Sequence, residues 1–293
     1  MDEVGLVVGD GGRRREDCSG GAAQEVWSRS ASVQPPGRAA VGDGLVYSPP
    51  HPPETAIEIS PALFLTTWAS GLAIGAAIVA GWRVVGPGFG WLSAGVVVLF
   101  GGTGWAVGGG WPAGLGTLAA VVAFALARRS GPSVVALLVS GALYVAASVP
   151  DGGLLGTLSG AVLLGGVTTE MLLGHWYLID PALPRWALKR LAAIGAVGVV
   201  ADAIVLGVDA GTELGAEVVG WAFLVLAITT LALMAAVWFA LNEPSYPGVM
   251  AATGLSYLAI LTAIGAAAAG RALVDEGTSL LGADLVLDTI ALL

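Results

Sequence analysis

Four side chains that can bind protons or ligands lie close together near the end of one apolar segment. They are Glu170, His175, Trp176 and Tyr177. A carboxylate and an imidazole in this position could take up and pass on a proton, because imidazole titrates near neutral pH. An ionisable group inside an apolar segment is a candidate functional group by default, because placing it in lipid is costly.

Helical geometry limits how these groups can combine. On a helix, Glu170 shares a face with Gly166 and Gly174, whereas His175 lies on a different face. The two glycines leave room beside the carboxylate for a partner helix, a water molecule or a ligand. Glu170 is about 12 Å inside the nearer end of its segment, at ~1.5 Å per residue.

Asp202, in the next apolar segment, is the second buried acid that we consider. It lies about 20 Å from the same side of the membrane, at ~1.5 Å per residue, so only a water chain could join it to Glu170. We expect Asp202 to be an interfacial carboxylate hydrated from the opposite side. Lys189 and Arg190 are the expected ion-pair partners of Glu170, reaching inward along their aliphatic stems.

Three interpretations of this group stay open. The first is a structural ion pair of Glu170 with Arg190, with His175, Trp176 and Tyr177 as an anchor at the membrane surface. The second is a proton- or cation-binding pocket that opens to the cytoplasm, in which Glu170 carries the charge. The third is a metal or quinone site beside His175.

Few residues are available for a metal or a cofactor. Cys18 is the single cysteine, and the second histidine, His51, lies in a proline-rich stretch. Zinc sites usually take three or four protein ligands, which His175 and Glu170 do not provide alone. We therefore predict no metal site and expect no cofactor.

The composition indicates that lipid is the solvent for most of the chain. Charged residues make up 11% and hydrophobic residues 56% of the sequence, whereas soluble domains carry roughly 25% charged residues. The charges concentrate before Ser60, after Arg271 and in short connections. We expect the bilayer as partner and no nucleic acid.

Continuous apolar runs predict an all-α, polytopic transmembrane bundle of about eight helices of ~20 residues each. Continuous rather than alternating runs exclude a membrane β-barrel. Eight prolines, from Pro87 to Pro247, are expected to fall between the helices. The predicted helices are 60–82, 89–108, 112–128, 132–149, 153–177, 188–208, 218–241 and 248–271.

This pattern divides the chain into three parts. Residues 1–58 are predicted to be a disordered leader, because they are rich in Gly, Ser, Pro and charge. Residues 59–272 form the transmembrane domain. Residues 273–293 are expected to form an amphipathic helix on the outer surface or a frayed end.

The positive residues predict the orientation. Six basic residues fall in connections on one side, and none falls in the opposite loops, which carry Asp151, Asp209, Glu213 and Glu217. Basic loops face the cytoplasm, so both termini are predicted outside it. Abundant Ala, Gly and Val with a single lysine suggest the plasma membrane of a GC-rich bacterium. The six basic residues are Arg83, Arg128, Arg129, Arg185, Lys189 and Arg190.

Glycines recur every four residues in several predicted helices, which lets neighbouring backbones approach closely. These faces could build the bundle itself or bind a second copy or a complex partner. Examples are Gly71 with Gly75, Gly104 with Gly108, and Gly152 with Gly156 and Gly160.

The preferred function is proton- or cation-linked transport through a cytoplasm-facing pocket at Glu170 and His175. The alternatives are a non-catalytic membrane subunit or anchor of a larger complex, and a quinone- or metal-binding redox component. The chain contains no nucleotide-binding loop, zincin helix or nucleophile elbow. We therefore predict no catalytic residue and do not expect an enzyme.

Overall fold

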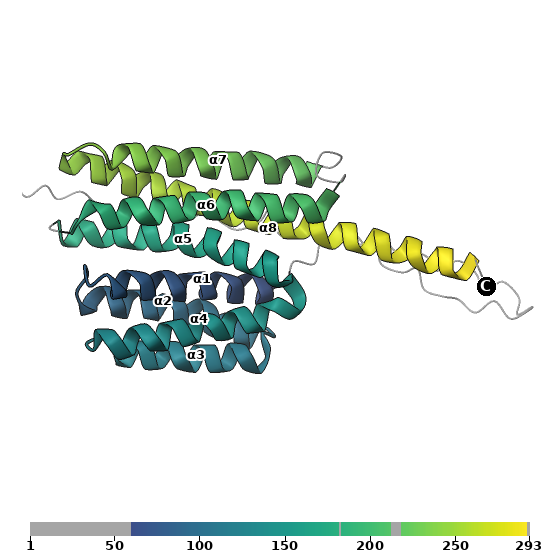
Figure 1. Ribbon diagram of the computed structural model, residues 1–293, viewed down its shortest axis with the longest axis horizontal. Coiled ribbons are helices and arrows are strands. Elements are labelled where there is room, and N and C mark those ends of the chain that lie inside the picture. The colour runs from purple at the N-terminus through teal and green to yellow at the C-terminus, as the bar shows by residue number, and fades with distance from the viewer. Residues whose placement is uncertain (1–59, 182, 212–217, 292–293) are drawn as a thin grey trace, which may run out of the picture. The chain divides into compact units, whose positions relative to one another are not determined.

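The computed structural model describes residues 60–181, 183–211 and 218–291, with side chains as far as Leu273. All regular structure in these ranges is helical, which confirms the all-α prediction. In chain order (Figure 1) the helices are α1 (Pro61–Gly81), α2 (Pro87–Ala106), α3 (Gly110–Ala125), α4 (Ser130–Gly152), α5 (Leu154–Ile179), α6 (Arg185–Ala210), α7 (Val218–Ala240) and α8 (Tyr246–Ala291).

Seven of the described helices are long and apolar enough to cross a membrane, which makes the chain a multi-pass membrane protein. The remaining helix, α3, is apolar but has only 16 residues. At ~1.5 Å per residue it is shorter than the ~30 Å hydrocarbon core. The predicted bundle of about eight helices is therefore present, with one short member.

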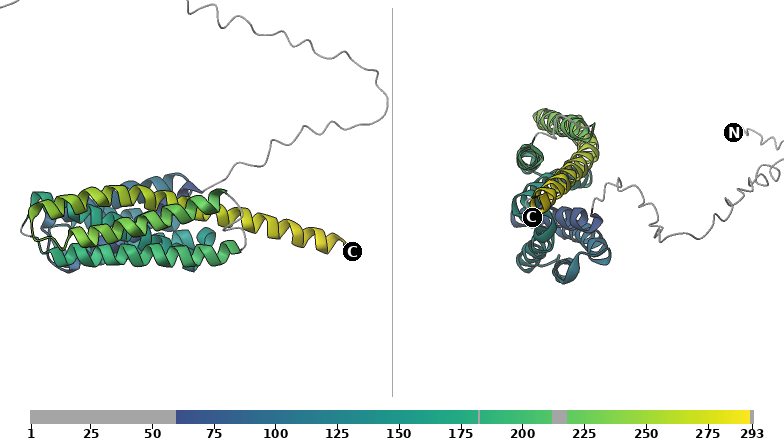
Figure 2. Two further views of the ribbon diagram at one scale, coloured as in Figure 1. Left: turned by 90° about the horizontal axis from the view of Figure 1, so that it is seen from above. Right: turned by 90° about the vertical axis from the view of Figure 1, so that its right-hand side faces the viewer.

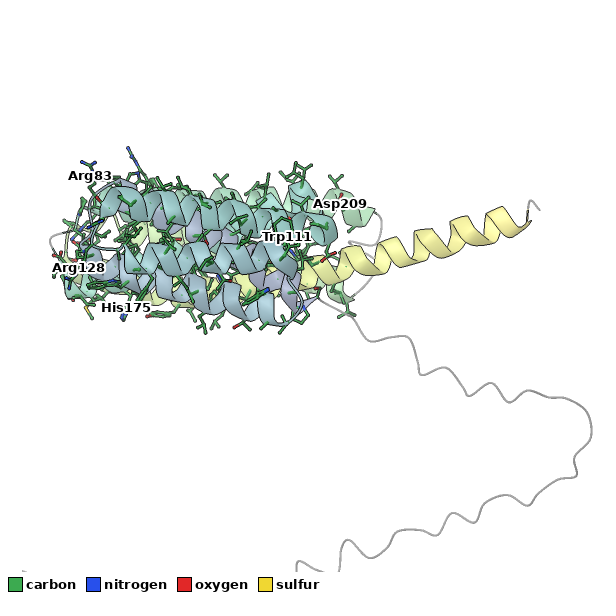
Figure 3. All side chains as sticks on the ribbon, turned by 90° about the horizontal axis from the view of Figure 1, so that it is seen from below. Arg83, Trp111, Arg128, His175 and Asp209 are labelled. Atoms are coloured by element: carbon green, nitrogen blue, oxygen red, sulfur yellow. The ribbon has the colours of Figure 1, made fainter. Side chains whose placement is uncertain are left out.

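The two ends of the bundle carry opposite charges. Arg83 and Arg128 lie at one end, and Asp209 lies at the other (Figure 3). We call the first the basic end, which also holds the start of α6 at Arg185, and the second the acidic end, which also holds Asp151 at the end of α4. The separation of charge predicted from the sequence thus follows from the up-and-down order of the helices.

Prolines and a serine cap start several of these helices. Pro61 and Pro87 occupy the first turns of α1 and α2, where a missing N–H costs no helical hydrogen bond. Ser60 caps α1 by accepting from the backbone N–H of Leu63 at 3.3 Å. The prediction that the eight prolines from Pro87 to Pro247 fall between helices is wrong for five of them. Pro150 lies inside the last turn of α4, and the other four lie in the first turns of α2, α3, α4 and α8, namely Pro87, Pro112, Pro132 and Pro247.

The final helix is longer than predicted. Instead of ending near residue 271, α8 continues without a break to Ala291, beyond the neighbouring end of α7 (Figure 2). The predicted leader, 1–58, lies outside the described residues, as do Glu213 and Glu217.

The helices form two groups of four. In each group every helix contacts its neighbours in the chain, and the first also contacts the fourth: α1 contacts α4, and α5 contacts α8. The groups meet mainly where α1 packs on α5, with smaller contributions from α2 and α4. Figure 1 shows α1 to α4 on one side of the molecule and α5 to α8 on the other.

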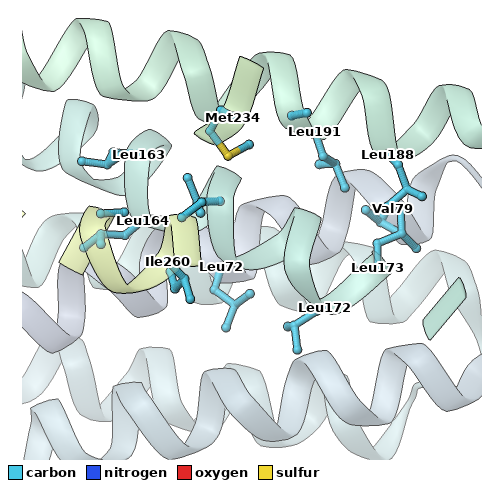
Figure 4. Packing of buried hydrophobic residues seen from close by; sticks show 14 of the residues in the cluster. Leu72, Val79, Leu163, Leu164, Leu172, Leu173, Leu188, Leu191, Met234 and Ile260 are labelled. Carbon is cyan, nitrogen blue, oxygen red and sulfur yellow. The ribbon is translucent and has the colours of Figure 1, made fainter. Parts of the chain in front are cut away.

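The apolar core gathers around α5. Leu163, Leu164 and Leu173 are almost wholly buried and lie among the packed apolar side chains (Figure 4). They meet Leu72 from α1 and Met234 from α7 in one continuous cluster. Because α5 contacts helices of both groups, its polar residues from Thr157 to Glu170 are surrounded by protein.

Glycines bring the backbones of α1 and α5 into direct contact. A Cβ atom added to Gly71 would lie 1.9 Å from the carbonyl oxygen of Ala161, and one added to Gly165 would lie 2.2 Å from the carbonyl carbon of Gly71. Across α5, Gly166 meets Gly195 of α6 in the same way. These glycines therefore pack the bundle internally, as small residues do between membrane helices.

Tyr144 holds α2, α3 and α4 together. Its buried ring lies against Gly101 and Gly116, and its hydroxyl is 3.0 Å from Thr117 Oγ1.

Replacing Tyr144 by phenylalanine should lower the free energy of unfolding by about 0.5–1 kcal/mol, the usual value of a hydrogen bond between membrane helices. Unfolding in detergent mixtures measures this loss, and Tyr246→Phe, at an exposed tyrosine, should cause none. An equal loss in both variants would contradict the assignment.

Candidate functional site

Glu170 lies in the middle of the protein and not in a pocket open to solvent. Its side chain is wholly buried, and the hydroxyl of Ser256 on α8 donates to Oε2. The other carboxylate oxygen, Oε1, has no hydrogen-bond partner among the described residues. A buried carboxylate therefore faces one neutral donor.

Two features of α5 and α8 place this pair. Gly174 has no side chain, so Thr253 of α8 packs against it, with Oγ1 3.0 Å from where a Cβ would be. Ser256 lies about one turn further along α8, which brings its hydroxyl to the level of Glu170. The predicted room beside Gly174 is thus occupied by a partner helix.

His175 is separated from Glu170, as their different helical faces indicated. Its side chain is exposed at the basic end, and Nδ1 lies 3.1 Å from the hydroxyl of Tyr257. Tyr257 follows Ser256 in α8, so consecutive residues of that helix contact the carboxylate and the imidazole. The two groups are linked through α8 rather than brought together in one pocket.

Trp176 and Tyr177 do not gather around His175. The Trp176 ring packs edge-on against Phe89, with ring centroids 6.3 Å apart, and covers Gly88. Tyr177 is buried in the core. Among the described residues no three His, Cys, Asp or Glu side chains lie close enough to hold a metal ion.

The expected ion pairs of Glu170 are not formed. Lys189 Nζ donates to Asn242 Oδ1 at 2.6 Å, and the Arg190 guanidinium stacks 4.7 Å above the ring of Trp186. Both cations stay at the basic end because acceptors and an aromatic face are available there. Glu170 instead accepts from Ser256 of α8.

Asp202 is not an interfacial carboxylate. Its side chain is 1% exposed, and it accepts from Ser159 Oγ at 2.7 Å. Arg271 of α8 approaches both carboxylate oxygens at 3.4 Å and also donates to the carbonyl of Gly156 at 3.0 Å. The guanidinium lies over Gly160, where a side chain would collide with it.

Sequence reasoning missed Arg271 because it falls where the last apolar segment was expected to end. A signal was nevertheless present. Arg271 is a basic residue at the acidic end, where a cation is unusual, and a buried acid, Asp202, lies in a neighbouring segment near the same membrane level. Two opposite charges at similar depth predict a pair, since neither is tolerated alone in lipid.

Polar side chains without partners follow α5 and its neighbour α1. Besides Glu170 Oε1, the buried hydroxyls of Thr67, Thr157 and Thr169 have no hydrogen-bond partner among the described residues. Thr169 lies against Gly75, and Thr67 lies against Gly160 beside the Arg271 guanidinium. We call these four residues, Thr67, Thr157, Thr169 and Glu170, the polar seam.

The polar seam extends along the helices from near the acidic end to the level of Glu170. Thr157 and Glu170 are about 20 Å apart along α5, at ~1.5 Å per residue. Buried polar atoms without partners cost ~1–3 kcal/mol each. Their concentration along one helix pair is therefore a feature that packing alone does not explain.

Comparison with known proteins adds no relative. No protein-family model, no curated protein and no solved structure matches this chain.

Proposed function

We propose that this protein moves protons across the membrane and that Glu170 takes them up and releases them. The observation that carries the proposal is the surroundings of that carboxylate, which is wholly buried and contacts a neutral hydroxyl instead of a cation. A charge in lipid is costly, so an acid without a cation is most stable there when it holds a proton. Such a group binds a proton at rest and is suited to exchange it.

Ser256 can serve both states of this acid. Its hydroxyl has one proton but two acceptors in reach, Glu170 Oε2 and, at 2.9 Å, the carbonyl of Ala252. When Glu170 is protonated, it can donate to Ser256, which then donates to Ala252. When Glu170 is ionised, Ser256 turns to donate to the carboxylate. The hydrogen bond between α5 and α8 is kept in both states.

Groups on either side of Glu170 suggest the direction of movement. Toward the basic end lies the exposed His175, whose Nδ1 is 3.1 Å from the Tyr257 hydroxyl, and imidazoles commonly relay protons. Toward the acidic end the polar seam offers the hydroxyls of Thr169 and Thr67. We further propose that the basic end faces the cytoplasm of a bacterial cell, which puts both termini outside it.

The test is proton flux in liposomes that contain the purified protein and a pH-sensitive dye. With a potassium diffusion potential applied, the intact protein should acidify the interior, and Glu170→Gln should reduce the flux to that of protein-free liposomes. Glu243→Gln removes the same charge from an exposed position and should retain full flux. Full flux in Glu170→Gln would contradict the proposal.

The same observation also favours a second function, a structural subunit of a larger membrane complex. A carboxylate sealed from solvent on every side could simply fasten α8 to α5. In that case the intact protein carries no flux, and Glu170→Gln is folded and equally inactive. A co-purifying membrane partner that binds both forms would then support the subunit.

A further inference from the structure

The group formed by α1 to α4 contains a cleft at its acidic end. This cleft, of about 270 Å³, opens between the start of α1, the turn from α2 to α3, and the end of α4. It is lined by polar and aromatic residues as well as apolar ones, among them Thr66, Trp111 and Asp151. None of these three belongs to the polar seam or contacts Glu170.

The cleft offers acceptors of hydrogen bonds. The Asp151 carboxylate is exposed, and none of the described residues that line the cleft is a lysine or an arginine. Pro150 has no N–H, so the carbonyl of Ala146, four residues earlier in α4, lacks its usual helical donor. Ala146 and Pro150 both line the cleft. The end of α4 therefore contributes to the lining both an exposed carboxylate and a residue whose carbonyl lacks its usual helical donor.

The start of α3 supplies an aromatic ring to the lining of the cleft. Trp111 is 75% exposed, which is unusual for so large an apolar side chain unless it lies at the membrane surface or faces a ligand. A side chain at the neighbouring Gly109 would not fit, because its Cβ would lie 2.8 Å from the carbonyl oxygen of Gly104. Gly108 and Gly110 have φ angles of 121° and 70°, which side chains rarely adopt.

Charge and size together select the ligand. A carboxylate beside an indole ring is the arrangement that binds ammonium groups, through ionic and cation–π attraction. An anion would be repelled by Asp151. Among the described lining residues it would find only two side-chain donors, the Thr66 hydroxyl and the Trp111 indole N–H. Pockets for drug-sized molecules have volumes of ~300–1,000 Å³, so this smaller cleft suits a headgroup or a small amine.

We propose that the cleft binds an ammonium group, held between Asp151 and Trp111 with the carbonyl of Ala146 as a further acceptor. The group can belong to a free amine or to an aminophospholipid of the outer leaflet, because both present the same chemistry. This binding does not depend on proton transport through Glu170.

The test is calorimetric titration of the delipidated, full-length protein with ethanolamine and with choline at constant ionic strength. Saturable binding is expected, and Asp151→Asn should raise Kd by about tenfold or more, because it removes the charge of the acceptor. Trp111→Leu should raise Kd by about two- to thirtyfold, the range of cation–π interactions.

Matched controls exist at the same end of the protein. Asp209→Asn removes an exposed acid, and Trp221→Leu removes an exposed indole, both outside the cleft. Neither should change Kd. Absence of saturable binding to the delipidated protein, or equal binding by Asp151→Asn and the unaltered protein, would overturn the proposal.

A second measurement distinguishes the two sources of the ammonium group. The titration is repeated in nanodiscs of phosphatidylethanolamine and in nanodiscs of phosphatidylglycerol. If phosphatidylethanolamine abolishes binding of the free amines and phosphatidylglycerol does not, the occupant is a lipid headgroup. Equal binding in both lipids identifies a free amine.

Discussion

Replacing Gly71 by leucine should separate the two groups of four helices or prevent folding. The new side chain would have to enter the space held by the backbone of Ala161 and Gly165, which cannot move as a flexible side chain can. Overpacking usually costs ~1–3 kcal/mol, and a clash with backbone should exceed that range. Unfolding in mixtures of mild and denaturing detergent measures the loss.

Gly254→Leu is the matched control for this substitution. Gly254 lies inside α8, as Gly71 lies inside α1, but nothing lies within 4 Å of the position that its Cβ would take. The control should unfold at the same detergent fraction as the unaltered protein. If both variants are equally stable, α1 and α5 do not touch through their backbones.

Removing Asp202 should destabilise the protein strongly, because it leaves the Arg271 guanidinium buried without its anion. Loss of one partner of a buried ion pair costs about 3–5 kcal/mol. We therefore expect Asp202→Leu to lower the free energy of unfolding by about that amount. Ser159 keeps an acceptor in the variant, since the carbonyl of Gly156 is 3.3 Å away.

The double variant Asp202→Leu with Arg271→Met isolates the charge. It removes both ions together, and apolar replacements for a buried pair are often neutral or stabilising. Its stability should return to within about 1 kcal/mol of the unaltered protein. Asp209→Asn, at an exposed acid, should change nothing. If the double variant is as unstable as Asp202→Leu, the loss does not come from an unpaired Arg271 guanidinium. The backbone carbonyls would then be the main partners of Arg271.

The helices could be predicted from the sequence because each physical requirement leaves a local pattern. A span needs an uninterrupted apolar run, and a turn needs proline, glycine or charge. The helices therefore begin close to their predicted first residues, and all except α8 also end close to their predicted last residues. The position of Pro150 inside α4 was not predicted, because a proline in a last turn removes one hydrogen bond without ending the helix.

The partners of the buried acids could not be predicted in the same way. Helical phase placed Glu170 and His175 on different faces, and the structure agrees. Helical phase could not say that Glu170 turns toward Ser256 of α8 rather than toward Arg190 of α6, because that depends on which helices are neighbours in space. Arg271 was missed for the same reason, since its partner precedes it by 69 positions.

The contact between α1 and α5 restricts which residues either helix can carry at the crossing. Gly71 and Gly165 meet backbone to backbone, so a first side-chain carbon has no space at either position. Trp68 of α1 also donates to Thr168 Oγ1 of α5 at 2.8 Å. A larger residue at one glycine cannot be compensated by a smaller side chain on the partner helix, because the obstacle is backbone.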